Sequence, residues 1–301
     1  TGTGNNAYGI FNDGAYNTTT VSGSITTAGF FANGIRNDGN YNNTTLSGSI
    51  TTSNDTYAYG IYNLGDSNTT TVSGSITTGT GYGATGIINI GSNNTTTVSG
   101  SITTTGVEAF GIYNDEDDNT TTLSGSIETT GEDAAGIAIF GESNTTTVSG
   151  SIVTTGSAAH GIVHSSGLNP HTTTISGTVK ATGASSAALY NGQGPGNSFT
   201  LDEGAIIIGD IIAAEYAAFS QEITNSKLIF NLGASTSYAY SVSGKGEGTG
   251  AGQWTFSDLD RSSQVVTTTG TGCDTTITGA GNTVCNLITA VGAANAEVQN
   301  E

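Results

Sequence analysis

The chain has few charged residues, few prolines and very few basic side chains. Only 10% of its 301 residues are charged, far below the roughly 25% of a typical globular protein, so Thr, Ser, Asn and Gly must cover most of the surface. Proline occurs twice, and the 46 glycines follow no three-residue period, which excludes collagen and proline-rich linkers. No apolar run is long enough to cross a bilayer, so direct membrane insertion is not expected.

The shortage of basic residues also limits the partners. Five Lys and Arg stand against 24 Asp and Glu, a net charge of -19. Nucleic acid is excluded as a partner because its phosphates must be neutralised by basic side chains. Anionic membrane surfaces are disfavoured for the same reason.

Cysteine is nearly absent as well. Cys273 and Cys285 are the only two, and no histidine lies near them in the sequence, so a zinc site is poorly supported. We predict a disulfide between them that closes a short C-terminal loop, which implies an oxidising compartment. No cofactor is expected.

What the chain has in abundance is a repeat of about 25 residues. The unit reads Ala-x-Gly-Ile-x-Asn, a turn, Asn-Thr-Thr-Thr-Val-Ser-Gly-Ser-Ile, then Thr-Thr and a second turn, and it occurs seven times. β-formers and turn residues at this period, without a helical pattern, predict a solenoid of stacked β-coils. The expected fold is all-β: a β-solenoid (β-helix) with seven regular coils over residues 1–179 and at least one degenerate coil. Residues 180–301 are predicted to be an irregular β continuation that carries the disulfide.

Strand alternation assigns the side chains of one coil to the inside or the outside. Within 94–102, alternation places Thr96 and Val98 inside. Gly100 marks a point where a side chain is too large or where the strand bends. The other strand of the coil is expected to begin at Ala84, a small residue where two walls come close.

Two asparagine positions recur in most of the regular coils, one in five coils and the other in six. Like residues of neighbouring coils lie about 4.8 Å apart in such a stack, so each column can form a hydrogen-bonded amide ladder and satisfy turn backbone groups. The first column is Asn12, Asn37, Asn63, Asn89 and Asn114, and the second is Asn17, Asn42, Asn68, Asn94, Asn119 and Asn144.

The positions that flank Gly-Ile alternate in size from coil to coil. Aromatic pairs in coils one, three and five would recur about every 9.6 Å along one outward face. Two interpretations stay open: a contact surface for a partner or a carbohydrate, or scattered surface aromatics without a role. The aromatic positions are Tyr8, Phe11, Tyr59, Tyr62, Phe110 and Tyr113, and the even coils carry Asn33, Arg36, Thr85, Ile88, Ala135 and Ala138 there.

Other polar groups give weaker hypotheses. Outward rows such as Thr95 and Thr97 form a hydroxyl lattice that suits ice binding, although Thr also favours strands for its own sake. The acidic run 115–118 is expected to be a solvated turn rather than a calcium loop, because it matches no regular ligand spacing.

Catalysis and metal binding are not expected. The three histidines, His160, His164 and His171, lie in one coil at predicted turn or outward positions, and no nucleophile is paired with a base. The basic residues are spread along the chain at Arg36, Lys180, Lys227, Lys245 and Arg261.

Nearly the whole chain resembles a known class of exported protein. The combination AYGIYN (58–63) with NTTTVSGSITT resembles the passenger region of bacterial autotransporters, which are exported through their own outer-membrane barrel. SFTLDEGAIIIGDI (198–211) and NLGASTSYAYSVSG (231–244) are similar to segments that precede the barrel. The resemblance implies an extracellular or outer-surface location on a bacterium and an adhesive, coat or, in some members, enzymatic role.

These observations lead to two hypotheses for function. The chain enters its first coil from a turn at 1–4, without a capping element, and an open coil exposes strand edges. The first hypothesis is therefore a structural or adhesive solenoid whose copies join head to tail into a filament. The alternative is a surface adhesin that binds a glycan or ice.

Overall fold

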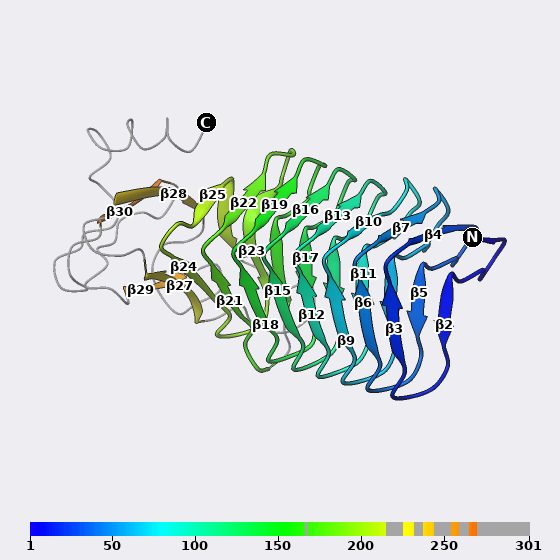
Figure 1. Cartoon of the computed structure of the whole chain (residues 1–301). Coiled ribbons are helices and arrows are strands. Elements are labelled where there is room, and N and C mark those ends of the chain that lie inside the picture. Colours follow the sequence, from blue (N-terminus) through cyan, green and yellow to red (C-terminus); the bar gives the residue numbers. More distant parts are fainter. Residues whose placement is uncertain (166–167, 215–224, 232–236, 244–253, 259–264, 270–301) are drawn as a thin grey trace.

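The protein is a parallel β-solenoid built from three sheets (Figure 1). The computed structural model describes residues 1–165, 168–214, 225–231, 237–243, 254–258 and 265–269. All regular secondary structure in these ranges is β-strand, so the predicted fold class is confirmed. Among these residues no helix has the length and apolar character needed to cross a bilayer.

Each coil contributes one strand to each sheet, in the order sheet B, sheet C, sheet A. Sheet B consists of β2 (Ile10–Asn12), β5 (Ile35–Asn37), β8 (Ile61–Asn63), β11 (Ile87–Asn89), β14 (Ile112–Asn114), β17 (Ile137–Ile139), β20 (Ile162–Ser165), β23 (Ala187–Gln193), β26 (Asp210–Ala213), β28 (Ser237–Ser243) and β30 (Val265–Thr269). Sheet C consists of β3 (Thr18–Val21), β6 (Asn43–Leu46), β9 (Thr69–Val72), β12 (Thr95–Val98), β15 (Thr120–Leu123), β18 (Thr145–Val148), β21 (Thr172–Ile175), β24 (Ser198–Asp202), β27 (Ser226–Asn231) and β29 (Trp254–Asp258). Sheet A consists of β1 (Gly2–Thr3), β4 (Ser24–Ala28), β7 (Ser49–Thr52), β10 (Ser75–Thr77), β13 (Ser101–Thr104), β16 (Ser126–Thr129), β19 (Ser151–Thr154), β22 (Thr178–Ala181) and β25 (Ile206–Ile208).

Coil one comprises β2, β3 and β4, and the same triplet repeats up to coil eight, which comprises β23, β24 and β25. The register places equivalent residues of the repeat beside one another: Ile87 pairs with Ile61 on one side and Ile112 on the other. Coil eight keeps all three strands but has register shifts along β23. Much of the stretch 180–301 predicted to be irregular lies outside the described residues, and so do Cys273 and Cys285.

A corner inside the repeat divides a segment that alternation treats as one strand. β12 ends at Val98 and β13 begins at Ser101, with Gly100 between them. A Cβ atom on Gly100 would lie 1.8 Å from the carbonyl oxygen of Gly74 in the preceding coil, so only glycine fits. The strand bends here and a side chain is also excluded, which is why the coil has three walls.

The core is three columns of branched apolar side chains, one from each sheet. In coil four these are Ile87, Val98 and Ile102, which are at most 1% exposed. The burial of β12 alternates as the sequence predicts, with Thr96 and Val98 inside. Stacked apolar residues of this kind supply the main favourable free energy of the fold.

The strand expected to begin at Ala84 begins instead at Ile87, and Ala84 lies in the turn before it. Ala84 is fully buried, and its carbonyl oxygen accepts a hydrogen bond from the inward Thr78 hydroxyl at 2.5 Å. The same Thr-to-Ala bond recurs in coils one, two, four, five and six, at 2.6–2.8 Å. It closes the corner between sheets A and B by satisfying two buried polar groups.

The first asparagine column forms a buried chain of side-chain amides. The Nδ2 of Asn63 donates to the Oδ1 of Asn89 at 2.8 Å and to the hydroxyl of Thr70 at 3.1 Å. Asn37 donates in the same way to Asn63, at 2.7 Å. Each amide from Asn12 to Asn89 therefore links its own coil to the next and bonds to the inward Thr of sheet C.

In the second column, the asparagine side chains bond to backbone groups. The Oδ1 of Asn94 accepts the N–H of Asn68 in the preceding coil at 2.7 Å, and its Nδ2 donates to the carbonyl of Gly91 at 2.7 Å. The bond between coils recurs from Asn17 to Asn144. This ladder holds a turn whose preceding residue, Asn93 in coil four, has a left-handed φ of 60°.

Replacement of one ladder amide tests how strongly the columns bind the coils together. Asn63→Ala leaves Asn37, Thr70 and Asn89 with unsatisfied buried groups, so we expect a loss of about 2–5 kcal/mol from unsatisfied polar atoms. The matched control is Thr71→Ala, an outward-facing residue of the same coil, with an expected effect below about 0.5 kcal/mol. Urea denaturation followed by circular dichroism measures both, and equal effects would contradict the ladder's role.

Candidate functional site

Three aromatic pairs lie along sheet B, at the positions that flank Gly-Ile in coils one, three and five. We call each pair an aromatic rung. The ring centres within a rung are 5.4–5.5 Å apart, close enough for ring-ring attraction. The rungs are Tyr8 with Phe11, Tyr59 with Tyr62, and Phe110 with Tyr113.

The small residues of the even coils lie on the outward face, as alternation predicts, but they are buried between the rings of neighbouring coils. Asn33, Thr85 and Ile88 are 1%, 2% and 6% exposed. They are shorter than the rings of the coils above and below, so the rings cover them. The rings themselves are half-buried, apart from the more exposed Phe11.

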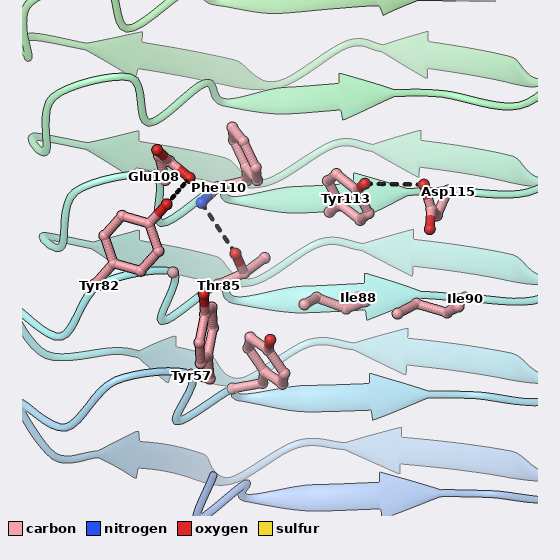
Figure 2. Close-up of a pocket in the computed structure, with 11 residues that line it drawn as sticks. Tyr57, Tyr82, Thr85, Ile88, Ile90, Glu108, Phe110, Tyr113 and Asp115 are labelled. Atoms are coloured by element: carbon pink, nitrogen blue, oxygen red, sulfur yellow. Dashed lines mark hydrogen bonds between the residues drawn. The ribbon is translucent and has the colours of Figure 1, made fainter. Parts of the chain in front are cut away.

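Tyr59 of the second rung and both rings of the third rung line a groove of about 260 Å³ (Figure 2). Coil four forms its floor, and the turns that lead into coils three, four and five form one end. We call this the aromatic groove. Its lining is Tyr57, Tyr59, Tyr82, Gly83, Thr85, Ile88, Ile90, Glu108, Phe110, Tyr113 and Asp115.

The floor fixes the position of the rung above it. The Thr85 hydroxyl accepts the backbone N–H of Phe110 at 3.1 Å. Asn33 does the same one gap earlier, where its Oδ1 accepts the N–H of Tyr59 at 3.0 Å. Coils two and four thus hold the next rung at a defined place on the sheet.

Two carboxylates lie on the rim, each bonded to a tyrosine hydroxyl. Tyr113 donates to Asp115 at 2.8 Å, and Tyr82 donates to Glu108 (Figure 2). The hydrogen bond to Glu108 raises the pKa of Tyr82 to about 12. Burial, with the bond to Asp115, raises the pKa of Tyr113 above its usual value. Both phenols therefore stay protonated and act as donors at neutral pH.

Sequence reasoning missed the residues that the turns supply. Phe31 and Tyr57 both have left-handed φ, and their rings stack with centres 5.1 Å apart. Gly83 takes this place in coil four, where a Cβ atom would lie 2.6 Å from the Tyr57 ring. Because Gly83 has no ring, there is room at this end of the groove. The 25- or 26-residue period aligns Phe31, Tyr57 and Gly83, so the sequence repeat could have identified this position.

The histidines correct another expectation. His164 and His171 are not outward but fully buried, and each takes an asparagine place in a ladder. The Nε2 of His164 lies 2.7 Å from the hydroxyl of Thr173, and the Nδ1 of His171 accepts the N–H of Asn144 at 3.3 Å. His160 instead stacks on Tyr190, with ring centres 4.3 Å apart.

No group of three potential metal ligands occurs in the part of the chain that the structure describes. The acidic turn 115–118 contributes to stacking, because the Asp117 carboxylate accepts the N–H of Glu142 at 2.7 Å. Thr95 and Thr120 are exposed and in register on sheet C, so the outward hydroxyl rows form a regular lattice.

Comparison with known proteins yields no relative: no family model, curated protein or solved structure matches the chain. The description of the site therefore depends on its own geometry.

Because His164 and His171 are buried, the stability of the folded chain is sensitive to acid. Burial lowers the pKa of His171 from 6.5 to about 4, and it lowers the pKa of His164 well below 6.5, with a further lowering by His171. The unfolded chain then binds more protons than the folded chain between pH 6.5 and 4. Stability is complete above about pH 6.5 and falls as the pH approaches 4.

Replacement of His171 by the asparagine of the other coils removes the part of this sensitivity that His171 contributes, while the part from His164 remains. We expect His171→Asn to keep the ladder bonds and to abolish a pH-dependent loss on the order of 3 kcal/mol. Thermal denaturation of the two proteins at pH 7 and pH 4.5 measures the difference. An equal drop in melting temperature for both proteins would contradict it.

Proposed function

We propose that the chain is an extracellular structural and adhesive β-solenoid, exported as the passenger region of an autotransporter. The observation that carries this proposal is the in-register stacking of seven three-stranded coils, which an eighth coil continues with register shifts along β23. A stack held by three apolar columns, two amide ladders and the sheet hydrogen bonds makes a stiff rod. Such a rod suits the display of repeated side chains away from a cell surface.

The aromatic groove supports the adhesive part of the proposal. It is a concave site with aromatic walls and a few polar groups at its rim, which is typical of ligand-binding sites. The proposal assigns no catalysis to the groove.

End-to-end assembly is the sharper form of the structural role. Within the described residues, β1, β2 and β3 each pair with one strand only. Val21 and Ile25 of coil one are each 8% exposed, whereas Leu46 and Ile50 of coil two are fully buried. A further coil, from another copy or from additional chain, would continue all three sheets and cover this apolar surface.

A proline at the open edge tests assembly without damage to the fold. The carbonyls of Asn17 and Val21 accept bonds from coil two, so the alternate residues Thr18 and Thr20 direct their backbone groups away from it. Thr20→Pro therefore removes only an edge donor, which an edge strand tolerates. The matched control, Thr97→Pro, lies in an inner coil and removes a backbone hydrogen bond between two strands of sheet C.

Electron microscopy of the purified chain at high salt, which screens the net charge of -19, provides the measurement. We expect fibres from the unaltered chain, single rods from Thr20→Pro and a loss of stability of about 3 kcal/mol or more from Thr97→Pro. Separate rods of uniform length from the unaltered chain would contradict self-assembly, and fibres from a folded Thr20→Pro chain would contradict docking at this edge.

A further inference from the structure

The gap between the first and second rungs shows what such a gap can hold, because the chain fills it with its own arginine. Arg36 lies in register between Phe11 and Tyr62. Its guanidinium carbon is 5.2 Å from the centre of the Tyr8 ring, 5.8 Å from that of Phe11 and 5.3 Å from that of Tyr62. These distances are within the range of cation–π attraction.

Hydrogen bonds complete the arginine's surroundings. The Nε and Nη2 of Arg36 donate to the two carboxylate oxygens of Asp38, at 2.5 and 2.8 Å, and Nη1 donates to the Tyr8 hydroxyl at 2.8 Å. The cation is thus held by aromatic faces, a bidentate carboxylate and a phenol, the set of partners that suits a planar guanidinium.

The next gap has the same aromatic frame without the cation, and Ile90 takes the place of Asp38 there. Ile88 takes the place of Arg36, in register between Tyr62 and Tyr113. Its side chain is shorter and carries no charge, and the aromatic groove lies beside it. Thr85 takes the place of Asn33 and makes the same bond to the rung above.

The charges of the groove favour a cation over a neutral ligand. Glu108 and Asp115 are in its lining, whereas no Lys, Arg or His is. Asp115 follows Tyr113 by two residues, just as Asp38 follows Arg36. Asp115 therefore lies at the corresponding end of the sheet, but on coil five, adjacent to the coil of Ile88. The remaining walls are the electron-rich faces of tyrosine and phenylalanine.

We propose that the aromatic groove binds a guanidinium group, presented by an arginine side chain of a partner polypeptide. The group would lie over Ile88, between Tyr59 and the Phe110–Tyr113 rung, with its N–H donors toward Glu108 and Asp115. This inference deepens the proposed adhesive role and rests on it.

The probe is N-acetyl-arginine methylamide, and its matched control is the citrulline compound, which has nearly the same shape but no charge. Binding to the intact chain at low salt is followed by isothermal titration and by NMR of the groove tyrosines. We expect the arginine probe to bind one site, at least tenfold more tightly than the citrulline probe.

Two variants exploit the two equivalent gaps. Ile88→Arg gives the groove its own cation and should weaken probe binding at least tenfold. Arg36→Ile empties the first gap, leaves the Asp38 carboxylate free and should raise the number of sites from one to two. A gain of a site cannot arise from misfolding, and circular dichroism checks the fold of both variants.

Equal binding of the arginine and citrulline probes would overturn the proposal, as would unchanged binding in a folded Ile88→Arg chain. Methyl β-glucoside serves as the neutral sugar probe. If it binds in the groove and the arginine probe does not, the guanidinium inference is wrong while the adhesive role remains. If neither binds, the guanidinium inference and the adhesive use of the groove both fail, while the structural role is tested separately by microscopy.

Discussion

The rest of the structure depends on stacking like residues at the spacing of a parallel sheet. Because each coil repeats after 25 or 26 residues, a buried amide meets an amide of the next coil that can accept its hydrogen bond, from Asn12 to Asn114 in the first column. This lets a narrow core contain a column of asparagines without unsatisfied groups. Coil six shows what happens when the column is interrupted: Ile139 takes the asparagine place, and the Thr146 hydroxyl beside it has no hydrogen-bond partner.

The sequence was sufficient to predict the solenoid, the coil length and the inward residues of the Thr-Thr-Thr-Val run, because these follow from period and alternation. It was not sufficient to predict three walls. Alternation from Thr96 through Val98 continues to Ile102 without a break. It left open whether Gly100 marks a bend or a place without room for a side chain, and the carbonyl of Gly74 beside Gly100 shows that it is both. Nor could it separate the buried His164 and His171 from exposed ones, although both fall at the period of the asparagine columns.

The candidate site was predictable only in part, for a related reason. The alternation of large and small residues beside Gly-Ile identifies the three rungs. Whether Thr85 and Ile88 are covered depends on the reach of rings from the coils above and below, which no single coil specifies. The groove then arises from differences between coils: Ile88 where coil two has Arg36, and Gly83 where coil three has Tyr57. In a repeat protein, departures from the repeat are where individual sites can form.

The most direct test of this account is hydrogen exchange at the asparagine side chains, measured by NMR. The account predicts that the Nδ2 protons of Asn37, Asn63 and Asn89 exchange as slowly as the backbone amides of the neighbouring strands, because both open only when coils separate. The exposed Asn54 provides the fast reference. Exchange of the ladder amides at the rate of Asn54 would mean that the columns do not hold the coils together, and the account would be wrong.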